Sequence, residues 1–308
     1  MAGQDSLDDL AEVHVSVGGR TLRLTNLGKV LYPATGTTKG EVLDYYARVA
    51  PVLLPHLHGR AVTRIRWPHG VAGESFFEKN VPARTPGWVR TATVPTTGSR
   101  TGSRQEGTIT FPVVEELATL TWLVNLAALE LHVHQWVVDD AGDPIGADRL
   151  VIDLDPGEPA GLHECCVVAL RVRDRLAEHG LTAYPVTSGS KGLHLYATLP
   201  APVPSEDSTA LAKQVAEELQ REQPDLVTAT MTKSRRTGKV FLDWSQNAGS
   251  KTTIAPYSLR GRERPTVATP LTWDEVETGA EDPLGLEQFR FEEVLQRIAD
   301  HGDLFGAP

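Results

Sequence analysis

The sequence predicts an α+β fold, held in one large domain or in two domains that share much of their surface. Short stretches of alternating apolar and polar residues, bounded by glycine or proline, are typical of strands. Longer stretches with apolar residues at helical spacing are typical of amphipathic helices. Both occur throughout the 308 residues, and a chain of this length with 40% hydrophobic residues can bury a substantial core.

The first predicted elements are a hairpin and a helix. Residues 13–24 alternate apolar and polar side chains around a Gly-Gly pair, as a β-hairpin does. Thr38 is expected to cap the helix, because Glu41 follows three residues later and completes a capping box. Apolar residues then recur at helical spacing to about Pro55, where we expect the helix to end.

Two predicted strands carry basic and aromatic side chains. The strand at 61–67 presents Arg64 and Arg66 on one face, and the short strand that follows carries Phe76 and Phe77. Arginines near aromatic rings suit nucleic acid, since they combine phosphate contacts with a stacking platform. Aromatic rings packed in the core beneath surface arginines are an equally open interpretation.

Residues 96–104 contain a Gly-Ser-Arg repeat, which indicates an exposed basic loop. It could contact phosphate or be an ordinary surface loop. A largely buried helix is predicted at 115–130, followed directly by a strand that presents His132 and His134 on one face. No cysteine or third histidine stands at a zinc-like spacing, so one histidine beside an anionic site is the better interpretation.

The strand at 149–156 (RLVIDLDP) brings two carboxylates, Asp153 and Asp155, to its end. Side chains two residues apart on a strand share a face, so these acids are expected to stand side by side. Neighbouring like charges need a partner, and a divalent cation such as Mg²⁺ binds carboxylate oxygens in sites for phosphoryl and nucleotidyl transfer. A solvated strand end is the alternative.

The next elements alternate between helices and strands. Helices are predicted at 162–179 and 207–223, and strands at 182–187 and 193–199. The turn at 188–192 (SGSKG) joins the two strands. Its glycines and hydroxyls could form a nest of amides facing an oxyanion, with Lys191 adding a charge, or it could be a plain hairpin turn.

A third acid follows a second basic loop. Residues 232–239 (TKSRRTGK) form this loop, which includes Lys233 and Arg236. The apolar strand after it ends at Asp243, just as the earlier strand ends at its two acids. A polar loop and an acidic helix at 287–301 complete the chain.

The net charge of −10 is unevenly distributed. Ten acids against two arginines lie in residues 274–303, and four more acids lie in residues 5–12. The rest of the chain is slightly basic, with positive residues grouped in local patches that can attract phosphates. No stretch approaches the roughly 18 apolar residues of a membrane span, and the N-terminus has no signal-like segment, so we expect a cytoplasmic protein. The cysteines, Cys165 and Cys166, are expected to be buried and reduced.

Several spaced blocks together resemble the polymerase domain of bacterial ligase D, a member of the archaeo-eukaryotic primase superfamily. The blocks are residues 31–39 (LYPATGTTK), 153–157 (DLDPG), 187–194 (TSGSKGLH), 243–247 (DWSQN) and 260–262 (RGR). The likeness covers about residues 20–303. It implies two merged α/β modules, the catalytic one with an RRM-like, mainly antiparallel sheet.

The resemblance also implies an organisation and a set of site residues. Residues 1–308 would be a single primase-polymerase catalytic domain, with a DNA- and 5′-phosphate-binding module at about 13–130, a catalytic module at 131–265 and an acidic C-terminal segment at 266–308. Two Mg²⁺ or Mn²⁺ ions would be held by Asp153, Asp155 and Asp243. The nucleotide would be bound by His132, Ser188, Lys191, His194, Lys251 and Arg260. The DNA and its 5′-phosphate would be bound by Asn26, Lys29, Lys39, Arg64, Arg66, Phe76, Phe77, Lys233 and Arg236.

Three features depart from the family pattern. Ile65 stands where a lysine is usual, the loop at 96–104 is longer, and no ligase Lys-x-Asp-Gly motif occurs. The resemblance therefore implies either a stand-alone relative or one domain of a longer protein. The implied partners are gapped or broken DNA with a 5′-phosphate, NTP or dNTP, a Ku-type protein and a DNA ligase acting in trans. The free protein is expected to be a bacterial, nucleoid-associated monomer that binds no membrane.

The function implied is a template-dependent DNA/RNA primase-polymerase, which adds nucleotides, NTPs preferred, to 3′ ends at gaps or breaks during end joining or short-gap filling. Rival functions remain open on the residues alone. A metal-dependent glycosyltransferase also uses Asp-x-Asp, although it does not need a separate basic site at 26–39. A phosphatase would use Asp153 as nucleophile, and a non-catalytic scaffold would only bind DNA ends.

Overall fold

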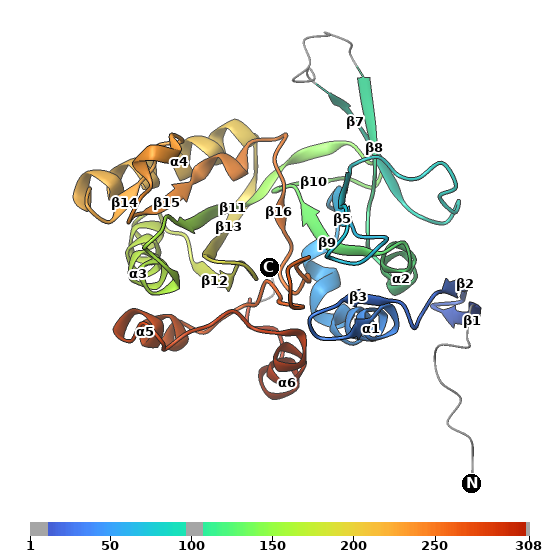
Figure 1. Ribbon diagram of the computed structural model, residues 1–308. Coiled ribbons are helices and arrows are strands. Elements are labelled where there is room, and N and C mark those ends of the chain that lie inside the picture. Colours follow the sequence, from blue (N-terminus) through green and yellow to red (C-terminus); the bar gives the residue numbers. More distant parts are fainter. Residues whose placement is uncertain (1–11, 97–106, 306–308) are drawn as a thin grey trace.

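Two large β-sheets, three smaller hairpins and the helices that cover the sheets make up the described part of the protein (Figure 1). The structure is a computed structural model, and it describes residues 12–96 and 107–305. The basic loop predicted at 96–104 lies almost entirely outside the described residues, as do the acids that precede Glu12.

The first sheet has four antiparallel strands in the order β16-β9-β5-β6. Their bounds are Thr253–Ile254, Ala128–Val133, Val62–Arg66 and Phe76–Glu78. Helices α1 (Lys39–Leu57) and α2 (Leu117–Asn125) pack with this sheet around one apolar core. Three hairpins surround it: β1 (Glu12–Val17) with β2 (Arg20–Thr25), β3 (Val30–Tyr32) with β4 (Thr37–Thr38), and β7 (Thr91–Thr96) with β8 (Gly107–Pro112).

The second sheet has six strands in the order β12-β13-β11-β15-β14, with β10 also paired to β11. Every pair in it is antiparallel except β14 with β15. The strands are β10 (Trp136–Val138), β11 (Pro144–Pro156), β12 (Ala183–Thr187), β13 (Leu193–Val203), β14 (Val227–Thr228) and β15 (Val240–Asp243). Helices α3 (Leu162–Glu178) and α4 (Ser205–Glu222) bury their apolar faces against it and form a second core.

The C-terminal segment spans both halves of the molecule. Helix α5 (Trp273–Glu281) packs on α3, and α6 (Phe291–His301) packs on α1 (Figure 1). Strand β16 also returns from the second half to join the first sheet beside β9. The two modules are therefore interleaved, and no single cut in the chain separates one sheet from the other.

Most predicted elements are confirmed, including the first hairpin and the capping box of Thr38 with Glu41. The helix predicted at 115–130 was wrong at its end, because α2 stops at Asn125 and β9 begins at Ala128. Ala127 between them has a left-handed backbone with φ 61°, which ends the helix. Helix α1 also continues through Pro55 to Leu57.

The structure also bears on the expected state of the cysteines and on the search for membrane-spanning helices. Cys165 and Cys166 are confirmed as buried free thiols on α3. In the part of the chain that the structure describes, no helix is both long and apolar enough to cross a membrane.

Candidate active site

The three predicted acids come together on neighbouring strands of the second sheet. Asp153 on β11 lies directly opposite Asp243 on β15 and, on its other side, opposite His194 on β13. Asp155 lies two residues further along β11, on the same face as Asp153. The register of three strands therefore places a row of titratable side chains at one end of the sheet.

The charges in this row act on one another. His194 Nε2 lies 3.3 Å from Asp153 Oδ1. Partial desolvation and the nearby charge of Asp153 raise the pKa of Asp155 to about 6, with Asp243 adding to the effect. Burial and the neighbouring acids thus outweigh the opposing charges of His194 and Arg236.

Asp243 is turned toward its own chain. Its Oδ1 accepts hydrogen bonds from Ser245 N at 3.0 Å and Ser245 Oγ at 2.6 Å, and its Oδ2 accepts one from Gln246 Nε2 at 2.9 Å. Among the described residues, no three His, Cys, Asp or Glu side chains already form a group arranged to hold a metal ion. The three carboxylates nevertheless fit a hard divalent cation in chemistry, because they supply oxygen ligands and unbalanced negative charge.

A cavity of about 240 Å³ opens over Asp153 and Asp155. Its lining includes two acids and three cationic side chains, so it carries charges of both signs. Its lining comprises Asp153, Asp155, Pro156, Ser188, Ser190, Lys191, His194, Arg260 and Arg262. A larger cavity of about 410 Å³ near the start of α4 has Glu206 as its charged lining residue, so it lacks this chemistry.

Some of the backbone amides in the turn between β12 and β13 are already hydrogen-bonded within the turn. Ser188 Oγ accepts hydrogen bonds from the amides of Ser190 at 3.2 Å and Gly192 at 3.1 Å. Those two amides therefore do not form the open anion nest that the sequence suggested. Lys191 is 71% exposed and lies 3.0 Å from Glu158, so its ammonium can swing into the cavity at low cost.

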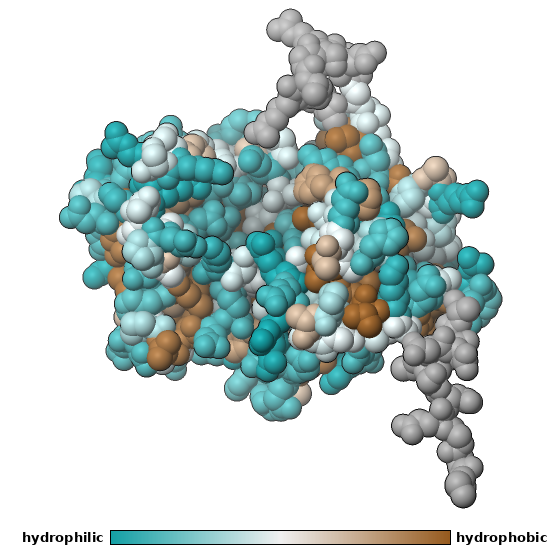
Figure 2. Space-filling view, viewed as in Figure 1, coloured by the Kyte–Doolittle hydropathy of each residue, from teal (hydrophilic) through white to brown (hydrophobic). Residues whose placement is uncertain are grey.

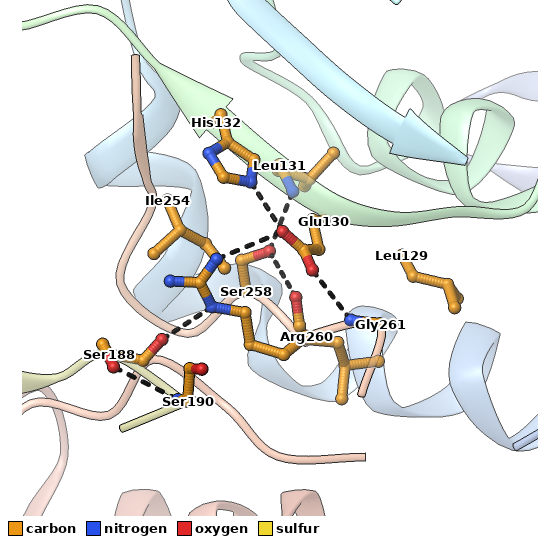
Figure 3. A network of polar contacts seen from close by, with 12 residues as sticks. Leu129, Glu130, Leu131, His132, Ser188, Ser190, Ile254, Ser258, Arg260 and Gly261 are labelled. Carbon is orange, nitrogen blue, oxygen red and sulfur yellow. Dashed lines mark hydrogen bonds and ion pairs between the residues drawn. The ribbon is translucent and has the colours of Figure 1, made fainter. Parts of the chain in front are cut away.

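Arg260 and His132 meet at a third residue, Glu130 (Figure 3). Arg260 donates from Nε to Ser188 O at 2.7 Å and from Nη1 to Glu130 Oε2 at 3.3 Å. His132 Nε2 lies 2.7 Å from the same Glu130 oxygen. Burial lowers the pKa of His132, which favours the neutral imidazole.

Neither histidine of the 131–136 segment lines the cavity, and His132 is linked to it through Glu130 and Arg260. His134 is buried, with Nδ1 3.2 Å from Ala61 O and its ring against Trp136. Burial lowers the pKa of His134 to about 4. It is a neutral packing residue of the first half of the molecule.

The predicted 5′-phosphate residues gather at the start of α1. Asn26 and Lys29 lie exposed on the loop before β3, and Lys29 O accepts the amide of Lys39 at 2.8 Å. The Lys39 side chain is buried and donates to Thr25 O at 2.6 Å. Burial, together with the charge of Lys29, lowers the pKa of Lys39 to about 8.

The predicted stacking aromatics are exposed. Phe76 is 41% and Phe77 57% exposed on β6, at an edge of the first sheet. Val30 on β3 is also exposed, and Figure 2 shows apolar patches among hydrophilic side chains in the half of the molecule that carries β3 and β5. Two adjacent exposed rings are therefore accessible at this edge of the first sheet.

The two arginines of β5 differ. Arg64 is fully buried and donates to Glu78 Oε2 at 2.9 Å and Asn80 O at 2.6 Å. Because β5 lies between two other strands and the Arg64 side chain is buried, this structure offers DNA no exposed surface of Arg64. Arg66 is 21% exposed and is held by the same Glu78 at 2.7 Å.

The remaining predicted residues lie outside the cavity. Lys251 is exposed on the turn before β16, and Lys233 is exposed on a short 3₁₀ turn, η2 (Lys233–Arg235). Arg236 stacks over Phe241, and its positive charge partly offsets the rise in the pKa of Asp155 that burial and Asp153 cause. Its loop is anchored to the turn after β11 by the bond from Gly157 N to Lys239 O at 2.8 Å.

Sequence reasoning did not single out two residues of the site. Arg262 lines the cavity, and its place in the RGR block was the available signal. Glu130 holds Arg260 and His132, yet the sequence placed it in a helix. On a strand, Glu130 and His132 share a face, and that spacing was the missed signal.

Comparisons with known proteins agree with this geometry. The family model of the LigD primase-polymerase domain matches residues 38–305. The multifunctional non-homologous end joining protein LigD of Mycolicibacterium smegmatis is 52% identical over 283 residues, 92% of this chain. The corresponding DNA repair protein of Mycobacterium tuberculosis H37Rv is 53% identical over 294 residues.

These relatives are much longer than this chain, which spans 35% and 37% of their lengths. A solved structure has nearly the same extent. The polymerase domain from Mycobacterium tuberculosis ligase D in complex with DNA superposes with a TM-score of 0.84 at 53% identity, covering 92% of this chain and 96% of that one. The likeness therefore concerns one domain of the longer relatives.

Proposed function

The chain belongs to the LigD primase-polymerase domain family, and we propose that it is a template-dependent primase-polymerase that extends 3′ ends at gaps or breaks in DNA. The observation that carries the proposal is the row of His194, Asp153 and Asp243, with a cavity that sets acids against arginines and a lysine. In the reaction, the 3′-hydroxyl oxygen bonds to the α-phosphorus of a nucleoside triphosphate. Pyrophosphate leaves, and the hydroxyl proton passes to solvent.

Asp153, Asp155 and Asp243 would hold two Mg²⁺ or Mn²⁺ ions. Bound there, the ions would lower the pKa of the hydroxyl and neutralise charge on the departing pyrophosphate. Asp243 can turn from Gln246 while keeping its bonds to Ser245, since its two oxygens serve different partners. His194 holds Asp153 from the opposite side.

The cationic side of the cavity would bind the triphosphate. Arg260 is rigid because two of its nitrogens are already engaged, whereas Lys191 and Arg262 are exposed and can adjust. His132 would lie near the nucleotide, and Lys251 would need to move to reach it. Following the family resemblance, we expect ribonucleotides to be preferred.

The DNA would lie across the first half of the molecule. Asn26, Lys29 and Lys39 would hold the downstream 5′-phosphate at the start of α1, where the helix dipole also favours an anion. Phe76 and Phe77 would stack on template bases, with Arg66, Lys233 and Arg236 available to phosphates. The solved relative was obtained with DNA, which supports a DNA partner for this chain.

The biological setting is part of the same proposal. The names of the relatives concern non-homologous end joining, so repair of breaks or short gaps fits best. A Ku-type protein and a ligase, in cis or in trans, would then supply end binding and sealing. We infer a soluble, nucleoid-associated protein that is monomeric when free.

A primer-extension assay tests the proposal. Wild-type protein should extend a primer on gapped DNA with Mg²⁺ or Mn²⁺, with NTPs favoured over dNTPs and a 5′-phosphate stimulating the reaction. Asp243→Ala should abolish extension while DNA binding persists. Glu206→Ala, which alters an exposed acid at the larger cavity, is the control and should extend normally.

The same assay separates the rivals. A DNA-end scaffold would bind DNA without metal or nucleotide dependence and would extend nothing. A glycosyltransferase would turn over UDP-sugar without DNA, and a phosphatase would trap a covalent aspartyl-phosphate. Extension by purified Asp243→Ala would remove the basis for the metal site.

A further inference from the structure

Glu130 on β9 is a buried carboxylate that does not line the cavity but contacts Arg260, which does (Figure 3). It is 5% exposed. Its Oε2 lies 2.7 Å from His132 Nε2 and 3.3 Å from Arg260 Nη1, and its Oε1 accepts the amide of Gly261 at 2.9 Å. One carboxylate thus contacts His132, the side chain of Arg260, which lines the cavity, and the backbone of Gly261 next to it.

Arg260 is held at both ends of its guanidinium. Nη1 donates a hydrogen bond to Glu130 on the first sheet, and Nε donates one to Ser188 O, which follows a strand of the second sheet. Nη2 has no partner within the described residues, and the side chain lines the cavity. The guanidinium therefore bridges the two sheets and keeps one nitrogen for a ligand.

The backbone beneath this arginine is fixed by the first half of the molecule as well. Tyr32 donates from its hydroxyl to Arg260 O at 2.8 Å. Gly261 lies so close to Trp67 that a Cβ there would sit 2.2 Å from the indole ring. Gly261 N also donates to Glu130. Glu130 therefore holds both the side chain of Arg260 and the backbone of the next residue.

The protonation states follow from these contacts. Burial raises the pKa of Glu130, but the hydrogen bond from His132 and the charge of Arg260 outweigh it and lower that pKa to about 2. Glu130 is therefore ionised at neutral pH. A neutral His132 must donate from Nε2 to it, which leaves Nδ1 as a hydrogen-bond acceptor.

We propose that Glu130 is a positioning residue of the nucleotide pocket: it holds Arg260, and with it His132, in the orientation that binds the incoming nucleotide. The inference rests on the proposed function for the identity of the ligand. Glu130 itself does not touch substrate. Rigid groups bind with less loss of side-chain freedom, so the benefit is affinity for the nucleotide.

A positioning role and a simple charge effect predict opposite signs. A carboxylate near a triphosphate repels it, so removing the charge alone would strengthen nucleotide binding. Releasing Arg260 from its clamp would weaken that binding. The direction of the change therefore identifies the role.

The main experiment compares wild type with Glu130→Gln, which keeps the shape and one acceptor for Gly261 N. We expect the KM for NTP in primer extension to rise about tenfold, with a smaller change in kcat. The Kd for NTP, measured calorimetrically with Mn²⁺ present, should rise by the same factor. Affinity for a 5′-phosphorylated DNA end should not change, because Lys29 and Lys39 are untouched.

Glu130→Asp separates geometry from charge and serves if the glutamine variant does not fold. It keeps the charge but withdraws the carboxylate by one methylene. Positioning predicts a raised KM for this variant also, whereas a charge effect predicts the wild-type value. Asp148→Asn is the matched control: it removes the negative charge that lies 2.6 Å from buried Arg60, away from the cavity, so it should lower the melting temperature and leave the KM unchanged.

A double variant tests the route of the effect. If Glu130 acts through Arg260, the increase in Kd for Glu130→Gln combined with Arg260→Ala should be well below the product of the two single effects. A full product, an unchanged KM or a lowered KM in Glu130→Gln would each overturn the proposal. Because the Kd needs no turnover, a wild-type protein that binds NTP but extends no primer would refute the proposed reaction without deciding the role of Glu130.

Discussion

Asp153 and Asp243 face each other across the β11–β15 ladder, although the chain between them forms two helices, three strands and the basic loop. Directly opposed residues on antiparallel strands bring their side chains within reach of one ion. Asp155, two residues along, is the member whose pKa is raised, to about 6. A carboxyl group with a pKa near 6 changes its protonation state in a pH range where the folded protein can be studied.

Metal binding should therefore depend on pH through Asp155. Below about pH 6 the carboxyl of Asp155 holds a proton, which a cation must displace. We expect the affinity for Mn²⁺, measured by calorimetry, to fall as the pH decreases from 7 to 5. Asp155→Asn should bind Mn²⁺ weakly and with a flatter pH dependence, and a wild-type affinity that is constant across this range would contradict the assignment.

The stability of the metal-free protein should respond with a definite sign. A carboxyl whose pKa is higher in the folded state than its usual 3.8 destabilises the fold once it ionises. Compared with Asp155→Asn, wild-type protein should lose unfolding free energy as the pH rises from about 4 to 6. Urea titrations of both proteins at several pH values measure this difference, and a constant difference would show that the carboxyl is not perturbed.

Recognition of the 5′-phosphate should weaken above pH 8. Lys39 has a pKa of about 8, so it loses its charge as the pH passes that value. We expect the preference for phosphorylated over unphosphorylated gapped DNA, measured as a ratio of Kd values, to decline between pH 7 and 9. Lys29→Ala should remove most of the preference and move the remaining transition to higher pH, because the charge of Lys29 helps to lower the pKa of Lys39. Equal affinity of wild type for both ends would refute the phosphate site.

Phe77 should contribute to DNA binding and little to stability. It is more than half exposed, so Phe77→Ala removes few internal contacts. Stacking on a base is worth about 1–3 kcal/mol, so affinity for DNA with a single-stranded template should fall about fivefold or more. Fluorescence anisotropy with that DNA measures the loss, and blunt duplex serves as the control substrate. An unchanged affinity for this DNA would show that Phe77 does not stack on a template base.

Arg64 and Arg66 form a matched pair for separating stability from binding. Arg64→Ala should lower the unfolding free energy by about 3 kcal/mol, because it removes a fully buried side chain and its bonds to Glu78 and Asn80, and should leave DNA affinity unchanged. Arg66→Ala should cost less stability and weaken DNA binding. Chemical denaturation and anisotropy give both quantities, and the reverse pattern would restore Arg64 as a contact.

The acids of the site were predictable because strand alternation is local. Asp153, Asp155 and Asp243 each end an apolar stretch, so their positions on strands followed from the sequence. Their pairing did not, because register depends on which strands meet. Arg64 shows the limit of the pattern: alternation assigns two residues to one face but does not say which face another strand or side chain covers.

Glu130 was missed for a specific physical reason. The backbone turns at Ala127 with a positive φ. Glycine at this position would have indicated such a turn in the sequence, but alanine does not. Without that turn the helix appeared to run on to residue 130. The pairing of Glu130 with His132 exists only because the strand has already begun at Ala128.

Strand β16 has a consequence for the order in which the protein assembles. Thr253 and Ile254 pair with Val133 and His132, whereas the rest of their sheet comes from residues before 134. During synthesis the first sheet must wait, with one edge open, until most of the second has left the ribosome. Refolding should therefore be limited by this late, long-range pairing, and an N-terminal fragment ending near residue 140 should be a substrate for chaperones and proteases rather than an independent DNA-end binder.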